Sequence, residues 1–409
     1  MRSEAAGAVL VPEGTRCPVC GNAALHGVLD LGEVPVFCNV QADSREAARA
    51  APTAPFRLAG CARCGHSFNA AFRPDRVEYA PAYDSSQHHS ETFRAYADAL
   101  ATRLVETHGV RDGAVVDVGC GKGDLLKRIC RAGGNRGFGF DASYEGDPRP
   151  ADAAGVEFHT EFFDAALAGE IAPQLICCRH VLEHVADPLA FLRELGRALA
   201  AAPGSVLYLE VPNGALQLER RLLWDYIYEH FSYFSAASLR LALEAAGLEV
   251  LRLETGFGEQ FLCADVRLRE PPPGPVEADP ASPFEALMAA TAADFTERLD
   301  AWRRWRDALP EDPDATVLWG AGSKGVTFVN LLELVVPGPV SRIVDQNPNK
   351  HGRFVARTGQ EIVAPEALRA VPPSQVVVMN AIYAGEISGW LAEREIRAEL
   401  LDAMGAPPS

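Results

Sequence analysis

The stretch Ala114-Val115-Val116-Asp117-Val118-Gly119-Cys120-Gly121-Lys122-Gly123-Asp124-Leu125-Leu126 decides how the middle of this chain folds. Its apolar run at residues 114–118 predicts a strand that is buried on both faces. Three glycines at alternate positions predict a close turn, and the pattern that follows predicts a helix. A strand, a glycine turn and a helix in this order present backbone amides to a ligand at the start of the helix.

Apolar runs and helical patterns alternate on both sides of this stretch, which predicts a doubly wound α/β sheet and a second, Rossmann-like α/β unit near the C-terminus. The strand-like runs lie at residues 137–141, 175–178, 206–211, 316–320, 341–345 and 375–379. A proline-rich segment at 271–283 and a polar helix at 283–309 separate the two units. We predict a metal module at residues 1–85, a ligand-binding domain at 86–268, a linker and helix at 269–300, and a C-terminal domain at 301–409.

Composition and charge exclude two classes of function. The chain of 409 residues has 38 basic and 55 acidic side chains, a formal charge of −17, which disfavours a non-specific nucleic-acid binder. No apolar run reaches the roughly 18 residues that a membrane span needs. The first residues lack the apolar core of a signal peptide, so we expect a cytoplasmic protein whose ten cysteines serve as metal ligands and core thiols.

The glycine turn has the form GxGxG, whereas dinucleotide-binding turns usually read GxGxxG. Asp117, just before the first glycine, would face a pyrophosphate unfavourably but suits the ammonium of a methionine moiety. One β-α unit later, Asp141 ends a predicted strand, where it can accept both hydroxyls of a ribose. We therefore predict an S-adenosylmethionine site formed by Asp117, Gly119, Gly121, Gly123, Asp141, Phe163 and Asp164.

Two CxxC pairs near the N-terminus predict a structural zinc site formed by Cys17, Cys20, Cys61 and Cys64. A glycine follows each pair, Gly21 and Gly65, and lets the backbone fold around the ion. Four thiolates leave no open position on zinc, so the ion would support the fold of a segment too short to form a core. Cys38 or His66 could replace one ligand, and four free cysteines are the alternative.

Several further segments resemble the three-domain nucleotide-sugar C-methyltransferases, which make branched deoxysugars for antibiotics. The resemblance covers nearly the whole chain, and its most specific segments are 181–188, 210–213, 228–235, 319–325 and 344–352. It implies a class I methyltransferase domain between an N-terminal zinc module and a C-terminal Rossmann-like domain. The implied acceptor is a small molecule, a nucleotide-linked sugar, and the implied oligomeric state is a monomer or a homodimer.

In the family that the chain resembles, a base removes a proton beside a 4-keto group and the enolate carbon attacks the sulfonium methyl. By matching position, the resemblance implies catalytic roles for His184, Glu229 and His230, and for Tyr228 in a motif one residue shorter than the family's Tyr-His-Glu-His. Histidine suits a base because its pKa lies near neutrality. The alternative is that His184 only begins a helix under the cofactor and that residues 228–230 form a wall of the core.

The acceptor pocket is where the chain departs from the family. The family's His-Gly-Gly-Ser is replaced by residues 256–261, in which Glu259 and Gln260 are the predicted substrate contacts. In the C-terminal turn, Ser323 and Lys324 are predicted to contact a phosphate, with a purely structural turn as the alternative. His88 and His89, near Tyr83, are interpreted as solvated loop residues.

Three functions are consistent with these patterns. The first is C-methylation of a nucleotide-linked keto-deoxysugar in natural-product or surface-glycan biosynthesis. The second is O- or N-methylation of a related sugar or other intermediate, which the altered residues 228–230 and 256–261 would allow. The third is a cofactor-binding partner protein without turnover.

Overall fold

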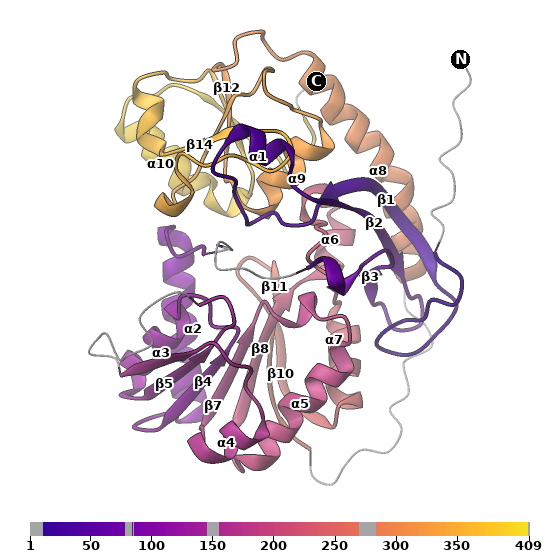
Figure 1. Cartoon of the computed structure of the whole chain (residues 1–409), viewed down its shortest axis with the longest axis vertical. Helices are drawn as coiled ribbons and strands as arrows, with labels where there is room; N and C mark the ends of the chain where they lie inside the picture. The colour runs from indigo at the N-terminus through magenta and orange to yellow at the C-terminus, as the bar shows by residue number, and fades with distance from the viewer. Residues whose placement is uncertain (1–10, 78–83, 85, 145–154, 270–283, 408–409) are drawn as a thin grey trace.

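The computed structural model describes residues 11–77, 84, 86–144, 155–269 and 284–407. The strands of these residues form three sheets, with four, seven and five strands. In Figure 1 the seven-stranded sheet forms the lower half of the molecule and the five-stranded sheet lies at the top. The predicted proline-rich segment at 271–283 lies outside the described residues, whereas the predicted helix after it is confirmed as α8 (Phe284–Asp307).

The seven-stranded sheet confirms the predicted doubly wound α/β fold. Its order is β10-β11-β8-β7-β4-β5-β6, in which the five strands from β8 to β6 are parallel. At the other edge β11 pairs antiparallel with β8, and β10 pairs antiparallel with β11. The bounds are β4 (Ala114–Val118), β5 (Arg136–Phe140), β6 (Val156–His159), β7 (Leu175–Arg179), β8 (Val206–Pro212), β10 (Leu248–Gly256) and β11 (Phe261–Leu268).

Helices cover both faces of this sheet. Neighbouring residues of one strand face opposite cores: Val115 packs with α2 (Glu91–His108) and α3 (Asp124–Gly133), and Val116 packs with the helices of the other face. Both valines are fully buried, which explains why this strand is a continuous apolar run. The helices of the second face are α4 (Ala165–Ile171), α5 (Pro188–Ala201) and α7 (Ala236–Ala245).

A buried ion pair fastens α2 to β11. The Asp265 carboxylate accepts hydrogen bonds from the Arg103 guanidinium at 2.6 and 3.1 Å, and it lies 3.1 Å from His108 Nε2. Burial alone would raise the pKa of Asp265, but the bonds to His108 and Arg103 outweigh it and lower the pKa to about 2. Because this pKa is below that of the unfolded chain, the contribution to stability is complete at neutral pH and disappears as the pH falls from about 4 towards 2.

We expect Asp265→Asn to lower the free energy of unfolding by about 2 kcal/mol at pH 7. The difference between wild type and variant should shrink as the pH falls from about 4 towards 2, because the carboxylate is protonated first in the unfolded chain and then in the folded one. Urea denaturation at several pH values measures this. Asp30→Asn is the matched control, because Asp30 pairs with Arg57 at the surface and should change stability by less than about 1 kcal/mol. An equal effect of the two variants would contradict the prediction.

The N-terminal sheet has the order β1-β2-β3-β9, and its last strand comes from the middle of the chain. The antiparallel hairpin of β1 (His26–Pro35) and β2 (Thr53–Gly60) encloses the short helix α1 (Arg45–Arg49). The bounds of the other two strands are β3 (Ser67–Asn69) and β9 (Ser232–Tyr233). The N-terminal sheet is therefore completed by a strand that lies between β8 and β10 in the chain.

The C-terminal sheet is parallel throughout, with the order β14-β13-β12-β15-β16. Helix α9 (Ser323–Leu331) follows β12, and helix α10 (Ala384–Glu393) lies between β15 and β16 in the chain. The strand bounds are β12 (Thr316–Trp319), β13 (Arg342–Val344), β14 (Glu361–Val363), β15 (Gln375–Val378) and β16 (Glu399–Asp402). The short helices are α6 (Gly214–Glu219) and the 3-10 turns η1 (Pro74–Arg76), η2 (Leu182–His184), η3 (Leu223–Asp225), η4 (Pro348–Lys350), η5 (Pro365–Arg369) and η6 (Ala381–Tyr383).

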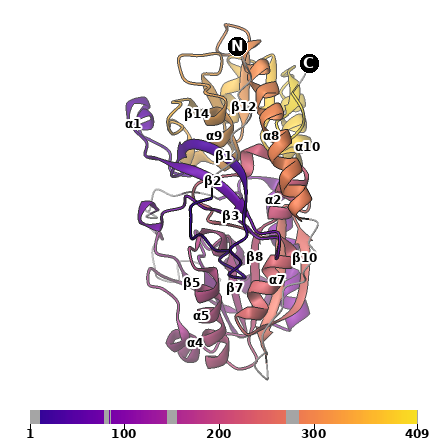
Figure 2. The ribbon, with the colours of Figure 1, turned by 90° about the vertical axis from the view of Figure 1, so that its right-hand side faces the viewer.

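One hydrophobic core joins the N-terminal sheet, α8 and the C-terminal domain. Phe56 of β2, Trp302 of α8 and Phe328 of α9 belong to the same buried cluster. Figure 2 shows α8 running beside the hairpin of β1 and β2. The contact is close: a Cβ on Gly60 would lie 1.8 Å from the sulfur of Met288 in α8. The N-terminal segment is therefore packed into the upper half of the molecule.

The C-terminal domain also forms hydrogen bonds with the N-terminus of α2. The Glu386 carboxylate of α10 accepts hydrogen bonds from the backbone N–H of Thr92, at 3.2 Å, and from the hydroxyls of Ser90 and Thr92, at 2.7 and 2.9 Å. A carboxylate at this end of a helix also interacts favourably with the helix dipole. A second contact links the two units, where Gln260 and Asn380 exchange amide hydrogen bonds of 3.2 and 2.8 Å.

Candidate active site

The glycine turn between β4 and α3 has the geometry that its sequence predicts. Gly119, Gly121 and Gly123 all have positive φ, at 72°, 54° and 74°. The turn is held against the next strand, because the N–H of Gly121 donates to Asp141 Oδ2 at 2.8 Å. Asp141 Oδ1 accepts from the N–H and the hydroxyl of Ser143, at 2.8 and 2.6 Å. The turn and Asp141 are thus adjacent at the carboxyl ends of β4 and β5.

Asp117 lies beneath this turn and is 4% exposed. Burial raises the pKa of its carboxyl to about 7, against the opposing influence of the nearby Arg179. A cationic group placed beside Asp117 would favour the ionised carboxylate.

The two remaining predicted cofactor residues lie at the start of α4. Phe163 is half-buried and its ring centroid lies 5.1 Å from that of Phe140. Asp164 is exposed, and its carboxylate caps α4 by accepting from the N–H of Leu167 at 2.9 Å. This capping accounts for Asp164 without a ligand, so its contact with a cofactor stays a prediction.

Two histidines meet at the carboxyl end of β7. The rings of His184, in η2, and His230 lie edge to face with their centroids 4.7 Å apart. His184 Nδ1 lies 3.0 Å from the backbone oxygen of Glu229, which can accept its hydrogen. Burial and the nearby His184 and His180 lower the pKa of His230 well below its usual value, so this imidazole is neutral at pH 7. The structure therefore brings together two of the four predicted catalytic side chains.

The other two predicted catalytic side chains contact the N-terminal segment. Tyr228 is fully buried, and its hydroxyl accepts from the backbone N–H of Arg73 at 2.9 Å in the N-terminal segment. The carboxylate of Glu229 is also buried and accepts from the N–H of Cys38 at 2.5 Å. Both side chains thus contact the N-terminal segment, and their catalytic roles stay predictions; Glu229 also contacts His184 through its backbone oxygen.

Sequence reasoning missed a buried charged network beside the two histidines. Glu210, at the end of β8, is fully buried and accepts hydrogen bonds of 2.8 and 2.7 Å from Arg179 and 2.6 Å from the hydroxyl of Tyr208. Burial opposes its ionisation, but Arg179 and His180 lower the pKa of Glu210 below its usual value. An acid near the carboxyl end of an otherwise apolar strand was the available signal.

His180 connects this network to the histidine pair. Its Nε2 lies 3.0 Å from Glu210 Oε1, and its Nδ1 lies 3.4 Å from Glu183 Oε1. Burial lowers the pKa of His180, but the two carboxylates outweigh it and raise the pKa to about 9. The backbone of His180 has φ of 53°, a conformation that non-glycine residues seldom adopt.

The predicted acceptor contacts are engaged within the chain. Glu259 is exposed and pairs with Arg220, while Gln260 bonds to Asn380. In the C-terminal turn the N–H of Ala321 donates to Asp345 at 2.7 Å, and Lys324 pairs with Asp225. Ser323 is half-buried at the start of α9. The phosphate and substrate contacts of these residues stay predictions.

The four predicted metal ligands converge on one point. Cys17 and Cys64 have sulfurs 3.6 Å apart, as have Cys20 and Cys61, and all four sulfurs lie within 4.8 Å of one another. The two knuckles match: the N–H of Gly21 donates to Cys17 and that of Gly65 to Cys61, each at 2.9 Å. This four-cysteine cluster can hold a metal ion. The alternative ligands are wrong, because Cys38 contacts Glu229 and the His66 ring packs on Phe68 and Phe234.

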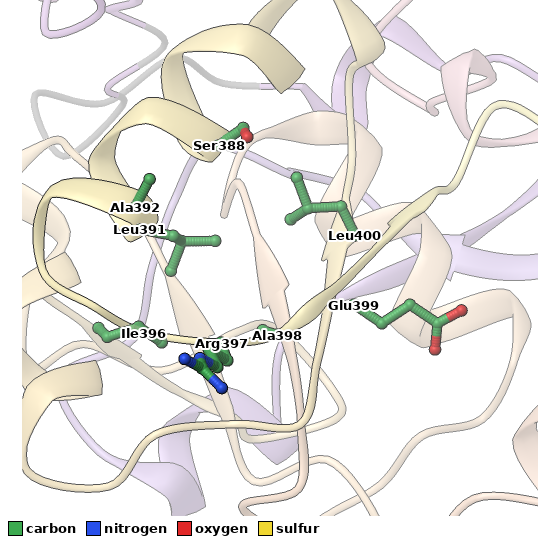
Figure 3. Close-up of a pocket in the computed structure, with 8 residues that line it drawn as sticks. All are labelled: Ser388, Leu391, Ala392, Ile396, Arg397, Ala398, Glu399 and Leu400. Atoms are coloured by element: carbon green, nitrogen blue, oxygen red, sulfur yellow. The ribbon is translucent and has the colours of Figure 1, made fainter.

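Two other expectations concern the edge of the site. His88 is half-buried with its ring against Phe93, so its interpretation as a solvated residue is corrected, and burial lowers its pKa to about 4. Tyr83 lies outside the described residues. Away from the histidines, a cavity between α10 and β16 is faced by Leu391 and Leu400 (Figure 3), and none of the predicted site residues lines it.

Two family models match the chain. Residues 87–253 match a methyltransferase domain, and residues 288–399 match a C-methyltransferase C-terminal domain. The first match and the doubly wound sheet define a class I methyltransferase domain. The second match is to the C-terminal domain of C-methyltransferases, so the chain is similar to that family over both regions.

A curated relative is the C-methyltransferase NovU of Streptomyces niveus, which is 28% identical over 246 residues. That alignment covers 58% of this chain and 57% of NovU, so the chain spans little more than half of the relative it matches. Among the solved structures, N,N-8-amino-8-demethyl-D-riboflavin dimethyltransferase of Streptomyces davawensis is 20% identical, with a TM-score of 0.33, over 44% of this chain and 55% of that one. Magnesium protoporphyrin IX methyltransferase of Synechocystis is 17% identical, with a TM-score of 0.33, over 44% of this chain and 84% of that one.

Within the described residues, the helices are too short or too polar to cross a membrane.

The glycine turn offers a direct test of the cofactor site. A Cβ on Gly119 would lie 2.2 Å from Val181 Cγ2 at a φ of 72°, so we expect Gly119→Ala to weaken binding of S-adenosylmethionine at least about tenfold. Gly109→Ala is the matched control: Gly109 has φ of 64°, but a Cβ there would meet nothing within 4 Å. Isothermal titration calorimetry should show unchanged affinity for the control. Equal affinities of the two variants would refute this role of the turn.

Proposed function

We propose that this protein is an S-adenosylmethionine-dependent methyltransferase that transfers a methyl group to the carbon of a nucleotide-linked keto-deoxysugar. The observation that carries the proposal is the pairing of β4 with β7 in one sheet. The glycine turn follows the first strand and the histidine pair follows the second, both at carboxyl ends, where open α/β sheets bind ligands. The predicted donor site and the groups suited to proton transfer thus lie at the same edge.

On the donor side, four groups suit S-adenosylmethionine. The carboxylate of Asp117 would pair with the methionine ammonium, and the turn would let the backbone pass close to the ligand. Asp141 would accept the ribose hydroxyls, and Phe163 with Asp164 would frame the adenine. The cofactor supplies an electrophilic methyl on a sulfonium centre.

On the acceptor side, His184 and His230 would remove and hold the proton beside the carbonyl group. His230 is neutral at pH 7 and therefore has a lone pair that can accept a proton, and its ring lies against that of His184. Glu183, which precedes His184 in the chain, forms an ion pair with His180, so these two charged groups lie close to the histidine pair. After the proton leaves, the enolate carbon would attack the sulfonium methyl.

Outside the site, we propose that the four-cysteine cluster holds a structural Zn²⁺, since four thiolates at tetrahedral spacing suit that ion. We propose that the protein acts in the cytoplasm, as a monomer or homodimer, in natural-product or surface-glycan biosynthesis.

The test is incubation with methyl-labelled S-adenosylmethionine and a panel of nucleotide keto-sugars in deuterated water. The expected result is a C-methyl product, with solvent deuterium entering the acceptor carbon before transfer. A labelled product whose methyl carbon has the chemical shift of an O- or N-methyl would favour the second candidate, which the altered loop of Glu259 and Gln260 motivates. Cofactor binding without any product would favour a non-catalytic partner protein.

A further inference from the structure

His180 lies between the donor side and the acceptor side of the proposed site. It directly follows β7, at the carboxyl edge of the sheet. The next residue, Val181, contacts the glycine turn, because a Cβ on Gly119 would lie 2.2 Å from its Cγ2. The turn η2, which comes next in the chain, carries His184 of the histidine pair. The backbone thus places His180 beside both groups that the proposed reaction uses.

Two carboxylates hold the imidazole of His180 as a cation. Its Nε2 lies 3.0 Å from Glu210 Oε1, and its Nδ1 lies 3.4 Å from Glu183 Oε1. Burial opposes the charge, but the two carboxylates outweigh burial and raise the pKa of His180 to about 9. Glu210 is also paired with the Arg179 guanidinium at 2.7 Å, so its charge stays balanced when His180 engages another group.

A ligand can reach one nitrogen of this cation. The side chain of His180 is 30% exposed, but Nε2 is buried against Glu210. The 3.4 Å between Nδ1 and Glu183 exceeds the usual N–H···O range of about 2.7–3.2 Å, so the Nδ1–H is the more weakly engaged donor. The ring packs edge to face on Phe261, with 4.7 Å between centroids, which fixes its orientation.

The proposed reaction needs a group that stabilises the enolate oxygen. Removal of the proton beside the carbonyl leaves negative charge on that oxygen, and a donor already aimed at it lowers the barrier. The roles proposed for His184 and His230 concern the proton alone. His180 supplies a positive charge and a donor beside them.

We propose that His180 is a further catalytic residue, whose Nδ1–H donates to the carbonyl oxygen of the acceptor and stabilises the enolate. This rests on the proposed function and leaves its histidine bases in place. When the base takes the proton, the electron pair of the C–H bond forms the C=C bond and the carbonyl π pair moves to the oxygen. As the carbonyl re-forms, the carbon bonds to the methyl group and the methyl–sulfur bond breaks, leaving a neutral thioether. His180 keeps its proton throughout.

His180→Asn tests this role, because asparagine removes the charge and tolerates the φ of 53° at this position. We expect methyl transfer, and exchange of the acceptor C–H with deuterated water, to slow at least about 100-fold. Arg221→Asn is the matched control: Arg221 also has φ of 53° and pairs with a carboxylate, Asp294, but against α8. The control should react as wild type. An affinity for S-adenosylmethionine within about threefold of wild type shows that His180→Asn is folded.

The pH profile separates this role from a structural one. His180 loses its proton as the pH rises through about 9, so kcat/KM of the wild type should fall above that pH, and His180→Asn should lack this alkaline limit. The titratable and charged groups around His180 are Glu183 and His184 of η2, Arg179 of β7, Tyr208 and Glu210 of β8, Cys263 of β11, Tyr96 of α2, and His230. Burial raises the pKa values of the tyrosines and the cysteine and lowers that of His230, so these groups do not titrate near pH 9.

Nitrogen-15 NMR of the histidines reads the charge without turnover, with His180→Asn identifying the signal. We expect both nitrogens of His180 to be protonated at pH 7. A neutral ring at pH 7, or a His180→Asn rate within about threefold of a wild type that forms the C-methyl product, overturns the inference alone. Exchange at the wild-type rate with slow transfer does the same. A wild type that forms no C-methyl product contradicts the proposed function, and with it the enolate that His180 would stabilise.

Discussion

Replacing His230 with glutamine should slow methyl transfer by at least about 100-fold, because proton transfer by a positioned side chain contributes about 10²–10⁴-fold to a rate. His230 faces His184 at 4.7 Å between ring centroids, beside the strand that pairs with the cofactor strand. Glutamine keeps much of the size of the imidazole but removes its basic nitrogen. The affinity for S-adenosylmethionine should change less than about threefold, since the histidine pair lies on the acceptor side. Initial rates with labelled cofactor measure the effect.

The matched control is His26→Gln. His26 lies in β1 and forms an exposed ion pair with Glu285, so its replacement should leave the transfer rate unchanged. Loss of exchange between the acceptor C–H and deuterated water in His230→Gln would place the defect in proton removal. Exchange at the wild-type rate with slow transfer would instead place His230 after proton removal and contradict its assignment.

Replacing Cys61 with serine should release the metal ion and unfold the N-terminal segment. Cys61 is fully buried and forms part of both the sulfur cluster and the knuckle that ends at Gly65. In small zinc domains the binding energy of the ion, about 10–16 kcal/mol, is the energy that folds the chain. Because the N-terminal sheet shares its core with α8 and the C-terminal domain, we expect the apparent Tm of the whole upper half to fall by at least about 5 °C.

Metal content by mass spectrometry and thermal unfolding check this prediction. Cys38→Ser is the control, because Cys38 is also buried in the N-terminal segment but lies outside the sulfur cluster. That variant should keep about one ion per chain. A Cys61→Ser protein with native stability and no bound metal would contradict a structural role for the ion, as would loss of metal from Cys38→Ser.

The local motifs of the sequence were sufficient for the fold class and for the glycine turn beside Asp141. The three glycines, Asp117 and Asp141 lie within two β-α units, so strand order and turn geometry bring them together without help from distant segments. The cysteine knuckles are local in the same sense, since each is one turn closed by its own glycine. Helices cover both faces of the seven-stranded sheet, so consecutive residues of its strands are buried. The strands therefore appear in the sequence as continuous apolar runs.

Side-chain direction at residues 228–230 was decided by tertiary contacts. Tyr228 and Glu229 bind the N-terminal segment, whereas His230 turns towards His184. The order of residues in a loop does not predict which side chain will contact which neighbouring element. The resemblance to a family implied catalytic roles for all three residues, and the structure shows which neighbours each side chain contacts.

The sequence by itself determined the α/β class, the glycine turn and the two cysteine knuckles, because these depend on the local periodicity and spacing of a few neighbouring residues. Only the tertiary structure decided that Glu210 forms ion pairs with Arg179 and His180 beside the histidine pair. It also decided that Glu386 of the C-terminal domain holds the start of α2, 294 residues earlier in the chain. Such charges are stabilised by partners from other elements, and pairing at that distance leaves no periodic signal in the sequence.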